Sequence, residues 1–125
     1  MRRVAWAFVP ALAYAAIIFA LSSQSEPLPF LPPEIFLQDK LLHAAEYAVL
    51  GGLLVRALHL AGLQPSVALV VAVVVASAFG ATDEFHQSFV PGRNSDVADW
   101  LADTLGATIG AVLVTAALRL PGRAG

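Results

Sequence analysis

The chain has 125 residues, of which 58% are hydrophobic and only 13% are charged, and its formal net charge is -2. Because a soluble domain has about 25% charged residues, this composition indicates a membrane protein, and its length suits one small domain. The small net charge and the absence of a basic run exclude nucleic-acid binding. Without cysteine the chain can form no disulfide, thiolate nucleophile or zinc–thiolate site.

Four stretches are predicted to cross a bilayer as helices, since about 20 residues at ~1.5 Å rise span its ~30 Å core. The predicted spans are residues 4–22, 39–61, 66–87 and 96–118. The first also resembles a signal peptide, but its apolar run exceeds the usual ~7–15 residues, so we expect an uncleaved anchor. The proline-rich residues 22–38 suit the membrane interface. The predicted fold is therefore an all-α polytopic membrane protein, a four-helix transmembrane bundle in a single domain, residues 1–125.

Basic and acidic residues divide between the two faces that this topology creates. Five arginines fall on one face, and only Lys40 and Arg93 fall on the other. These five are Arg2, Arg3, Arg56, Arg119 and Arg123. Since Lys and Arg are biased to the cytoplasmic side, both termini are predicted to be cytoplasmic. All nine carboxylates, which lie in the windows 26–46 and 83–103, then belong to the outer half of the protein, which faces the periplasm or exterior.

Polar side chains repeat at helical spacing at the outer ends of three predicted helices. These side chains are Asp39, His43 and Glu46 on the second helix, Asp83, Glu84 and Gln87 on the third, and Asp96, Asp99 and Asp103 on the fourth. Glu46, Asp83 and Asp103 lie about 10 Å inside the helix ends, where a lipid-exposed charge is costly. They are expected to face inward and form a functional site. The alternative is a structural polar network that holds the helices together, with Asp39 and Asp96 as helix caps.

The residue types at this end favour acid–base chemistry on an anionic ligand. His43 or Glu46 would be the general acid or base, with Asp83 and Glu84 as proton or metal partners. Arg93 would either clamp a phosphate or carboxylate or neutralise a neighbouring aspartate. The predicted ligand-binding residues are Tyr47, Gln87, Arg93, Asp99 and Asp103. Carboxylates with an imidazole could hold Mg²⁺ or Ca²⁺, although no spacing here matches a metal signature, so the cofactor is left open.

Two further features concern the helix surfaces. Gly106 and Gly110 form a GxxxG pair, which allows close approach of another helix. We expect this pair to pack within the bundle, with a homo-oligomer contact as the alternative. Lys40 and Arg56 are expected to extend to their interfaces.

Three motifs between Leu21 and Ala111 carry a family resemblance. They are Asp39-Lys40-x-x-His43-x-x-x-Tyr47, Asp83-Glu84-x-x-Gln87-x-Phe89-x-Pro91-Gly92-Arg93, and Asp99 followed by Gly106 and Gly110. Together they resemble the VanZ-like family of small integral membrane proteins, and the second motif is the most specific. Asp103 departs from the family pattern, which usually has asparagine there. The resemblance therefore implies that a neutral hydrogen-bonding residue suffices at this position.

The resemblance implies a protein of the bacterial cell envelope. VanZ itself is associated with resistance to the glycopeptide teicoplanin, by a mechanism that is not settled, and most relatives have no assigned activity. We expect an outer-leaflet site that acts on or binds a lipid-linked or lipid head-group ligand. One alternative is a non-catalytic protein that shields an envelope lipid or precursor. A proton-coupled transporter or flippase is less favoured, because no buried acid continues a path after Tyr47 or before Asp83.

Overall fold

A computed structural model describes residues 1–23, 36–93 and 95–122, except for the side chains of residues 36–39. The regular secondary structure of these residues is helical. In chain order the helices are α1 (Arg2–Ala7), α2 (Val9–Ser22), α3 (Phe36–Leu60), α4 (Pro65–Gln87) and α5 (Val97–Leu118). The predicted all-α class is confirmed for this part of the chain. Most of the predicted proline-rich loop, the side chain of Asp39 and Arg123 lie outside the described residues.

The first predicted span, residues 4–22, is divided into two helices at Phe8. Proline at residue 10 has no backbone N–H and cannot donate to the carbonyl of Trp6, so the regular ladder is interrupted there. Three helical segments are long and apolar enough to cross a membrane: Lys40–Leu60, Pro65–Gln87 and Val97–Leu118. The remaining apolar helix, α2, is shorter. The structure thus supports three candidate spans, and the first predicted span corresponds to two shorter helices, α1 and α2.

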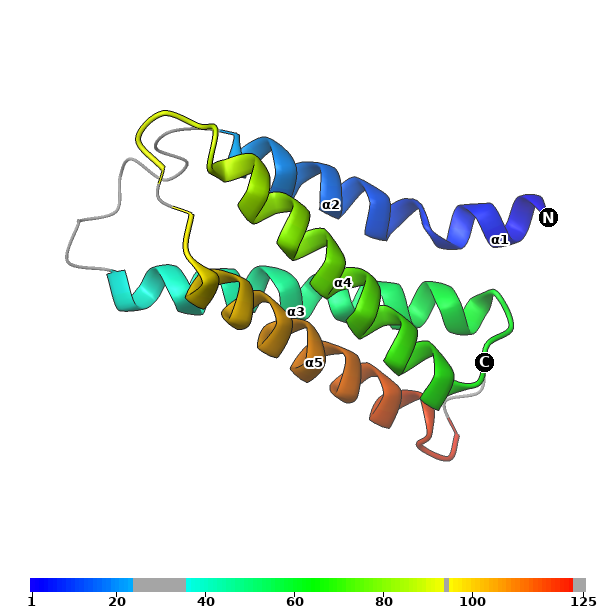
Figure 1. The fold of residues 1–125 in the computed structure, drawn as a ribbon. Coiled ribbons are helices and arrows are strands. Elements are labelled where there is room, and N and C mark those ends of the chain that lie inside the picture. The colour runs from blue at the N-terminus through cyan, green and yellow to red at the C-terminus, as the bar shows by residue number, and fades with distance from the viewer. Residues whose placement is uncertain (24–35, 94, 123–125) are drawn as a thin grey trace.

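The helices run back and forth between two ends of the bundle (Figure 1). The start of α1, the turn from α3 to α4 and the end of α5 lie at one end, which we call the terminal end. The end of α2, the start of α3 and the connection from α4 to α5 lie at the other, which we call the loop end. At the terminal end, Gly62 has a φ of 107°, which favours glycine, and Leu63 N–H donates to the Leu58 carbonyl at 3.1 Å. This turn reverses the chain after α3.

The pair α3 and α5 packs backbone against backbone. A Cβ atom on Gly106 of α5 would overlap the carbonyl of Ala44 on α3, and one on Gly110 would overlap that of Ala48. Conversely, a Cβ atom on Gly51 of α3 would overlap the carbonyl of Ala107 on α5. The predicted packing of the GxxxG pair within the bundle is therefore confirmed. This contact fixes how α5 is rotated against α3, and so determines which α5 side chains face His43.

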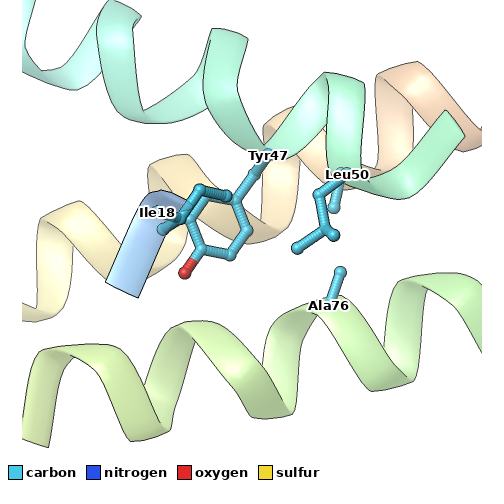
Figure 2. Close-up of a cluster of buried hydrophobic side chains, with 5 residues drawn as sticks. Ile18, Tyr47, Leu50 and Ala76 are labelled. Atoms are coloured by element: carbon cyan, nitrogen blue, oxygen red, sulfur yellow. The ribbon is translucent and has the colours of Figure 1, made fainter. Parts of the chain in front are cut away.

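Small side chains fill the interior, and large apolar side chains cover the outside. Two buried clusters form the core. The first contains Ile18, Tyr47, Leu50, Ala76 and Ala107, and Figure 2 shows the Tyr47 ring between α3 and α4 with Ile18 beside it. The second, nearer the terminal end, contains Val55, Ala68, Ala72 and Ala111. Many valines and leucines of α4 and α5 are exposed, which suits helices that contact lipid.

Candidate functional site

Buried polar side chains of α2, α3, α4 and α5 gather at the loop end of the bundle. Among the described residues these are Ser22, His43, Asp83, Glu84, Gln87, Asp99 and Asp103. Within the same part of the chain, the other buried polar residue is Thr115, in the terminal half of α5. The outer-end stripes that the sequence predicts on three helices therefore converge inside one bundle. We call this group the polar cluster.

His43 and Asp103 form the innermost pair of the polar cluster. The imidazole Nδ1 lies 2.8 Å from Asp103 Oδ1, and the two side chains are 9% and 0% exposed. An ionised Asp103 accepts a hydrogen bond from Nδ1–H, which leaves the lone pair on Nε2. The carboxylate thus selects the tautomer and fixes the plane of the ring. This is the arrangement that orients a histidine base or a histidine metal ligand.

Asp83 connects α4 to the end of α2. The Ser22 hydroxyl donates to Asp83 Oδ1 at 2.5 Å, and the carboxylate is almost fully buried. A second contact lies one turn along α4, where the Ser23 hydroxyl and His86 Nε2 are 3.0 Å apart. The His86 ring also stacks on Phe19, with 4.5 Å between ring centroids. Asp83 is therefore held by a neutral donor from a helix that carries no charge in this region.

Glu84 joins the end of α4 to the segment that enters α5. Its Oε2 accepts hydrogen bonds from the Asp96 backbone N–H at 3.1 Å and from the Ser95 hydroxyl at 3.2 Å. Its other oxygen, Oε1, is buried and has no hydrogen-bond partner among the described residues. One oxygen of Glu84 thus has a structural role, while the second is available to a ligand.

A partly exposed ion-pair layer lies at the mouth of the polar cluster. Lys40 Nζ is 3.0 Å from Asp99 Oδ1 and 3.5 Å from Asp96 Oδ2. Asp96 caps α5, because its Oδ1 accepts a hydrogen bond from the Ala98 N–H at 2.9 Å. This hydrogen bond, with a further contribution from Lys40, holds the pKa of Asp96 below its ordinary value. The predicted cap is confirmed, whereas Lys40 bridges two helices rather than only extending to the interface.

The remaining predicted site residues are distributed around this cluster. Tyr47 is fully buried in the first core cluster, 6.1 Å from Phe79 between ring centroids, and its hydroxyl has no hydrogen-bond partner among the described residues. Gln87 is buried at the last residue of α4. Arg93 is half-buried and interacts electrostatically with Asp83. Glu46 is also only half-buried, so it is less enclosed than Asp83 and Asp103, which we expected at the same depth.

Five side chains of this region were not among the predicted site residues: Ser22, Ser23, Lys40, His86 and Ser95. Lys40 and His86 lie within family motifs, so their motif positions could have indicated them. Ser22 and Ser23 lie within the stretch of the resemblance, Leu21 to Ala111, but in none of its three motifs. Ser95 has a weaker signal, since a serine before a helix cap is common. Their partners depend on contacts between helices, which the spacing along one helix does not specify.

Three members of the polar cluster are close enough to share a metal ion. His43, Glu84 and Asp103 each offer one donor atom, and these atoms lie within 4.8 Å of one another. All three side chains are buried. Chemically, the cluster can orient a basic nitrogen, present carboxylate oxygens to a cation, and place Arg93 near an anionic group.

A bundle with lipid-facing apolar helices and a buried polar cluster at one end defines a multi-pass helical membrane protein. The chain belongs to the VanZ/LLP1 family, whose model matches residues 6–118. The family predicted from the three motifs is thus confirmed. No curated protein and no solved structure matches the chain.

Proposed function

We propose that this protein binds and acts on a lipid-linked or lipid head-group ligand at the outer leaflet of a bacterial inner membrane, within the cell envelope. The observation that supports this most is the polar cluster itself. Its carboxylates, imidazole and amide are buried at one end of a bundle whose outer surface is apolar. Buried ionisable groups in a membrane protein are costly and commonly functional.

The proposed orientation places the loop end outside and the terminal end in the cytoplasm. Arg2, Arg3, Arg56 and Arg119 belong to the terminal end, while Lys40 and Arg93 belong to the loop end. This distribution follows the bias of basic residues to the cytoplasmic side. In this arrangement α1 and α2 together form a fourth, interrupted span, and both termini are cytoplasmic.

His43 is the proposed acid–base residue, because Asp103 orients it. Nε2 of its imidazole would accept or donate the proton, and Glu84 Oε1 would assist as the second acid–base group or as a cation ligand. Arg93 and the positive N-terminal end of α5 would attract an anionic head group. Asp83, Glu46, Tyr47, Gln87 and Asp99 are proposed to shape and polarise this site.

Lipid could reach the polar cluster from the side of the bundle. Phe85, on the last turn of α4, and Phe89, just after the helix, are 68% and 72% exposed, and their rings contact each other edge to face with 5.2 Å between centroids. Val97 is exposed at the start of α5. These side chains would contact acyl chains while the head group lies at the polar cluster. The resistance role associated with VanZ would follow if the ligand were an envelope precursor whose accessibility to teicoplanin changes on binding.

The test uses purified protein in lipid nanodiscs that carry a labelled phospholipid or lipid-linked sugar. Native mass spectrometry would measure the lipid retained, and chromatography would measure its conversion. We expect selective retention with slow conversion by the unmodified chain, and loss of conversion in His43→Gln. The control is His59→Gln, which changes a histidine in the last turn of the same helix, at the terminal end.

The outcomes separate the functions considered above. A ligand that is retained selectively but never converted would favour the shielding protein over the enzyme. Recovery of only bulk lipid in bulk proportions, with no conversion, would contradict both. Equal conversion by His43→Gln and the unmodified chain would exclude His43 as the acid–base residue.

A further inference from the structure

The innermost part of the polar cluster contains more oxygen acceptors than the described chain supplies donors. Glu84 Oε1 and Asp103 Oδ2 are both buried, and neither has a hydrogen-bond partner among the described residues. Asp103 is 0% exposed and Glu84 is 6% exposed, so bulk water does not solvate these oxygens. Two such carboxylates beside one imidazole are electrostatically unfavourable unless a cation or protons compensate them.

The donor atoms of His43, Glu84 and Asp103 have a separation that a single metal ion can bridge. Nitrogen and carboxylate ligands lie about 2.0–2.2 Å from Zn²⁺, so two ligands at the tetrahedral angle are about 3.4 Å apart. The three donor atoms lie within 4.8 Å of one another. Side-chain movements below about 1 Å would therefore complete the coordination, with no change in the helix arrangement.

A second observation, outside these three residues, points to the same position. The Tyr47 hydroxyl is buried and has no hydrogen-bond partner among the described residues. On α4, a Cβ atom at Gly80 would lie 3.3 Å from both Asp103 Oδ2 and Tyr47 Cε1. Asp103 Oδ2 and the Tyr47 ring thus both adjoin Gly80, which places a buried hydroxyl without a partner in the same region as the unpartnered carboxylate oxygen. Both groups suit a metal ion with a bound water or ligand oxygen.

We propose that His43, Glu84 and Asp103 bind one divalent transition-metal ion, with Zn²⁺ as the best fit and Mn²⁺ as the next. A mixed set of one imidazole and two carboxylates suits these ions. Mg²⁺ and Ca²⁺ fit less well, because they prefer six or more oxygen ligands or retain several waters. Three protein ligands leave at least one coordination position for a water or a ligand oxygen.

The metal site deepens the proposed function and rests on it for the role of the ion. With the ion bound, the His43 imidazole would be a ligand, so a metal-bound water would take over the acid–base role proposed for His43. A phosphate oxygen of a lipid head group would occupy the open position, and the ion would stabilise its negative charge. The Tyr47 hydroxyl would then donate a hydrogen bond to the metal-bound oxygen. Metal binding itself requires no lipid substrate, so the two proposals can fail separately.

The experiment uses the full chain, washed with chelator, in nanodiscs of zwitterionic phosphatidylcholine. Zn²⁺, Mn²⁺ and Mg²⁺ are titrated separately by calorimetry, and the metal content after desalting is measured by mass spectrometry. We expect one Zn²⁺ per chain. Glu84→Gln and His43→Gln should each weaken Zn²⁺ binding by about 100-fold or more, since even the loss of an outer partner costs about 10–100-fold. His59→Gln should bind as the unmodified chain does.

Several results would overturn the metal site. They are binding below one ion per chain, equal Zn²⁺ affinity in the unmodified chain and both site variants, and Mg²⁺ binding as tight as that of Zn²⁺. Circular dichroism checks that the variants fold. If neither folds, Co²⁺ added to the unmodified chain decides: an absorption spectrum of four-coordinate nitrogen and oxygen ligation supports the site, and the spectrum of aqueous Co²⁺ overturns it. Lipid retention by the metal-free chain, measured alongside, tests the proposed function independently.

Discussion

The loop end and the terminal end of this bundle are built on the same helices but bury different chemistry. Between α3, α4 and α5, the terminal half buries Val55, Ala68, Ala72 and Ala111. The close glycine–alanine contacts between α3 and α5 begin beside His43 and continue to the middle of the two helices. The loop half buries the polar cluster instead. Small apolar residues are therefore sufficient to associate these helices, as is common in membrane proteins. This contrast argues against the purely structural interpretation of the polar cluster, because the fold has a less costly way to pack.

The cross-helix hydrogen bonds nevertheless contribute to both structure and function. Asp83 and Glu84 each use one oxygen to hold α2 or the entry to α5. In Glu84 the second oxygen has no hydrogen-bond partner among the described residues. A network evolved only for stability would be expected to satisfy its buried oxygens. The difference between the two ends therefore predicts that packing variants harm stability most, whereas polar-cluster variants harm stability less and ligand binding more.

The largest expected effect on stability comes from Gly110→Val. A Cβ atom at this position overlaps the Ala48 carbonyl, so α3 and α5 must separate. We expect a loss of about 3 kcal/mol in the free energy of unfolding, at the upper end of overpacking costs. Thermal and denaturant unfolding in detergent, followed by circular dichroism, would measure it.

The matched control for this variant is Ala116→Val, on the exposed surface of the same helix. This change should alter the free energy of unfolding by less than about 0.5 kcal/mol. Equal stability of the two variants would show that the close α3–α5 contact does not hold these two helices together, and the argument that small residues are sufficient to pack them would then lose its basis.

Sequence periodicity was sufficient to predict the helices and the polar stripes, but not their partners. Apolar runs and glycine or proline turns placed α3, α4 and α5 within a few residues of their observed ends. The stripe at Asp99 and Asp103 follows from helical spacing alone. The break at Phe8 was missed because the apolar composition continues through it, although Pro10 gave a local signal.

The pairing of side chains could not be predicted because it depends on how each helix is rotated against its neighbour. The α3–α5 glycine contact brings Asp103 to His43 and leaves Glu46 half-buried. The same rotation pairs Lys40 with Asp99. Spacing along one helix shows which residues share a face, but it does not show which residues that face meets.

After Gly110→Val, the next largest effect on the free energy of unfolding is expected at Asp103. Asp103→Ala removes the partner of the buried His43 and should lower the free energy of unfolding by about 1–2 kcal/mol, the range of polar contacts between membrane helices. Asp103→Asn keeps an oxygen acceptor of nearly the same shape, so its cost should be below about 0.5 kcal/mol. The same unfolding measurements apply. If Asp103→Asn were as unstable as Asp103→Ala, a charge would be required at this position, contrary to the family pattern with asparagine.

The smallest effect is expected at Thr115, the buried polar residue of the terminal half. Its hydroxyl has no hydrogen-bond partner among the described residues, and valine has nearly the same shape. Thr115→Val should therefore leave the free energy of unfolding unchanged or raise it by up to about 1 kcal/mol.

The matched change at the loop end, Ser22→Ala, removes the donor to Asp83 and should lower the free energy of unfolding by about 1 kcal/mol. If Ser22→Ala lowers the free energy of unfolding and Thr115→Val raises it, a buried polar group stabilises the loop half and not the terminal half. A loss on Thr115→Val as large as that on Ser22→Ala would show instead that both ends depend on buried polar groups, and the functional argument for the polar cluster would weaken accordingly.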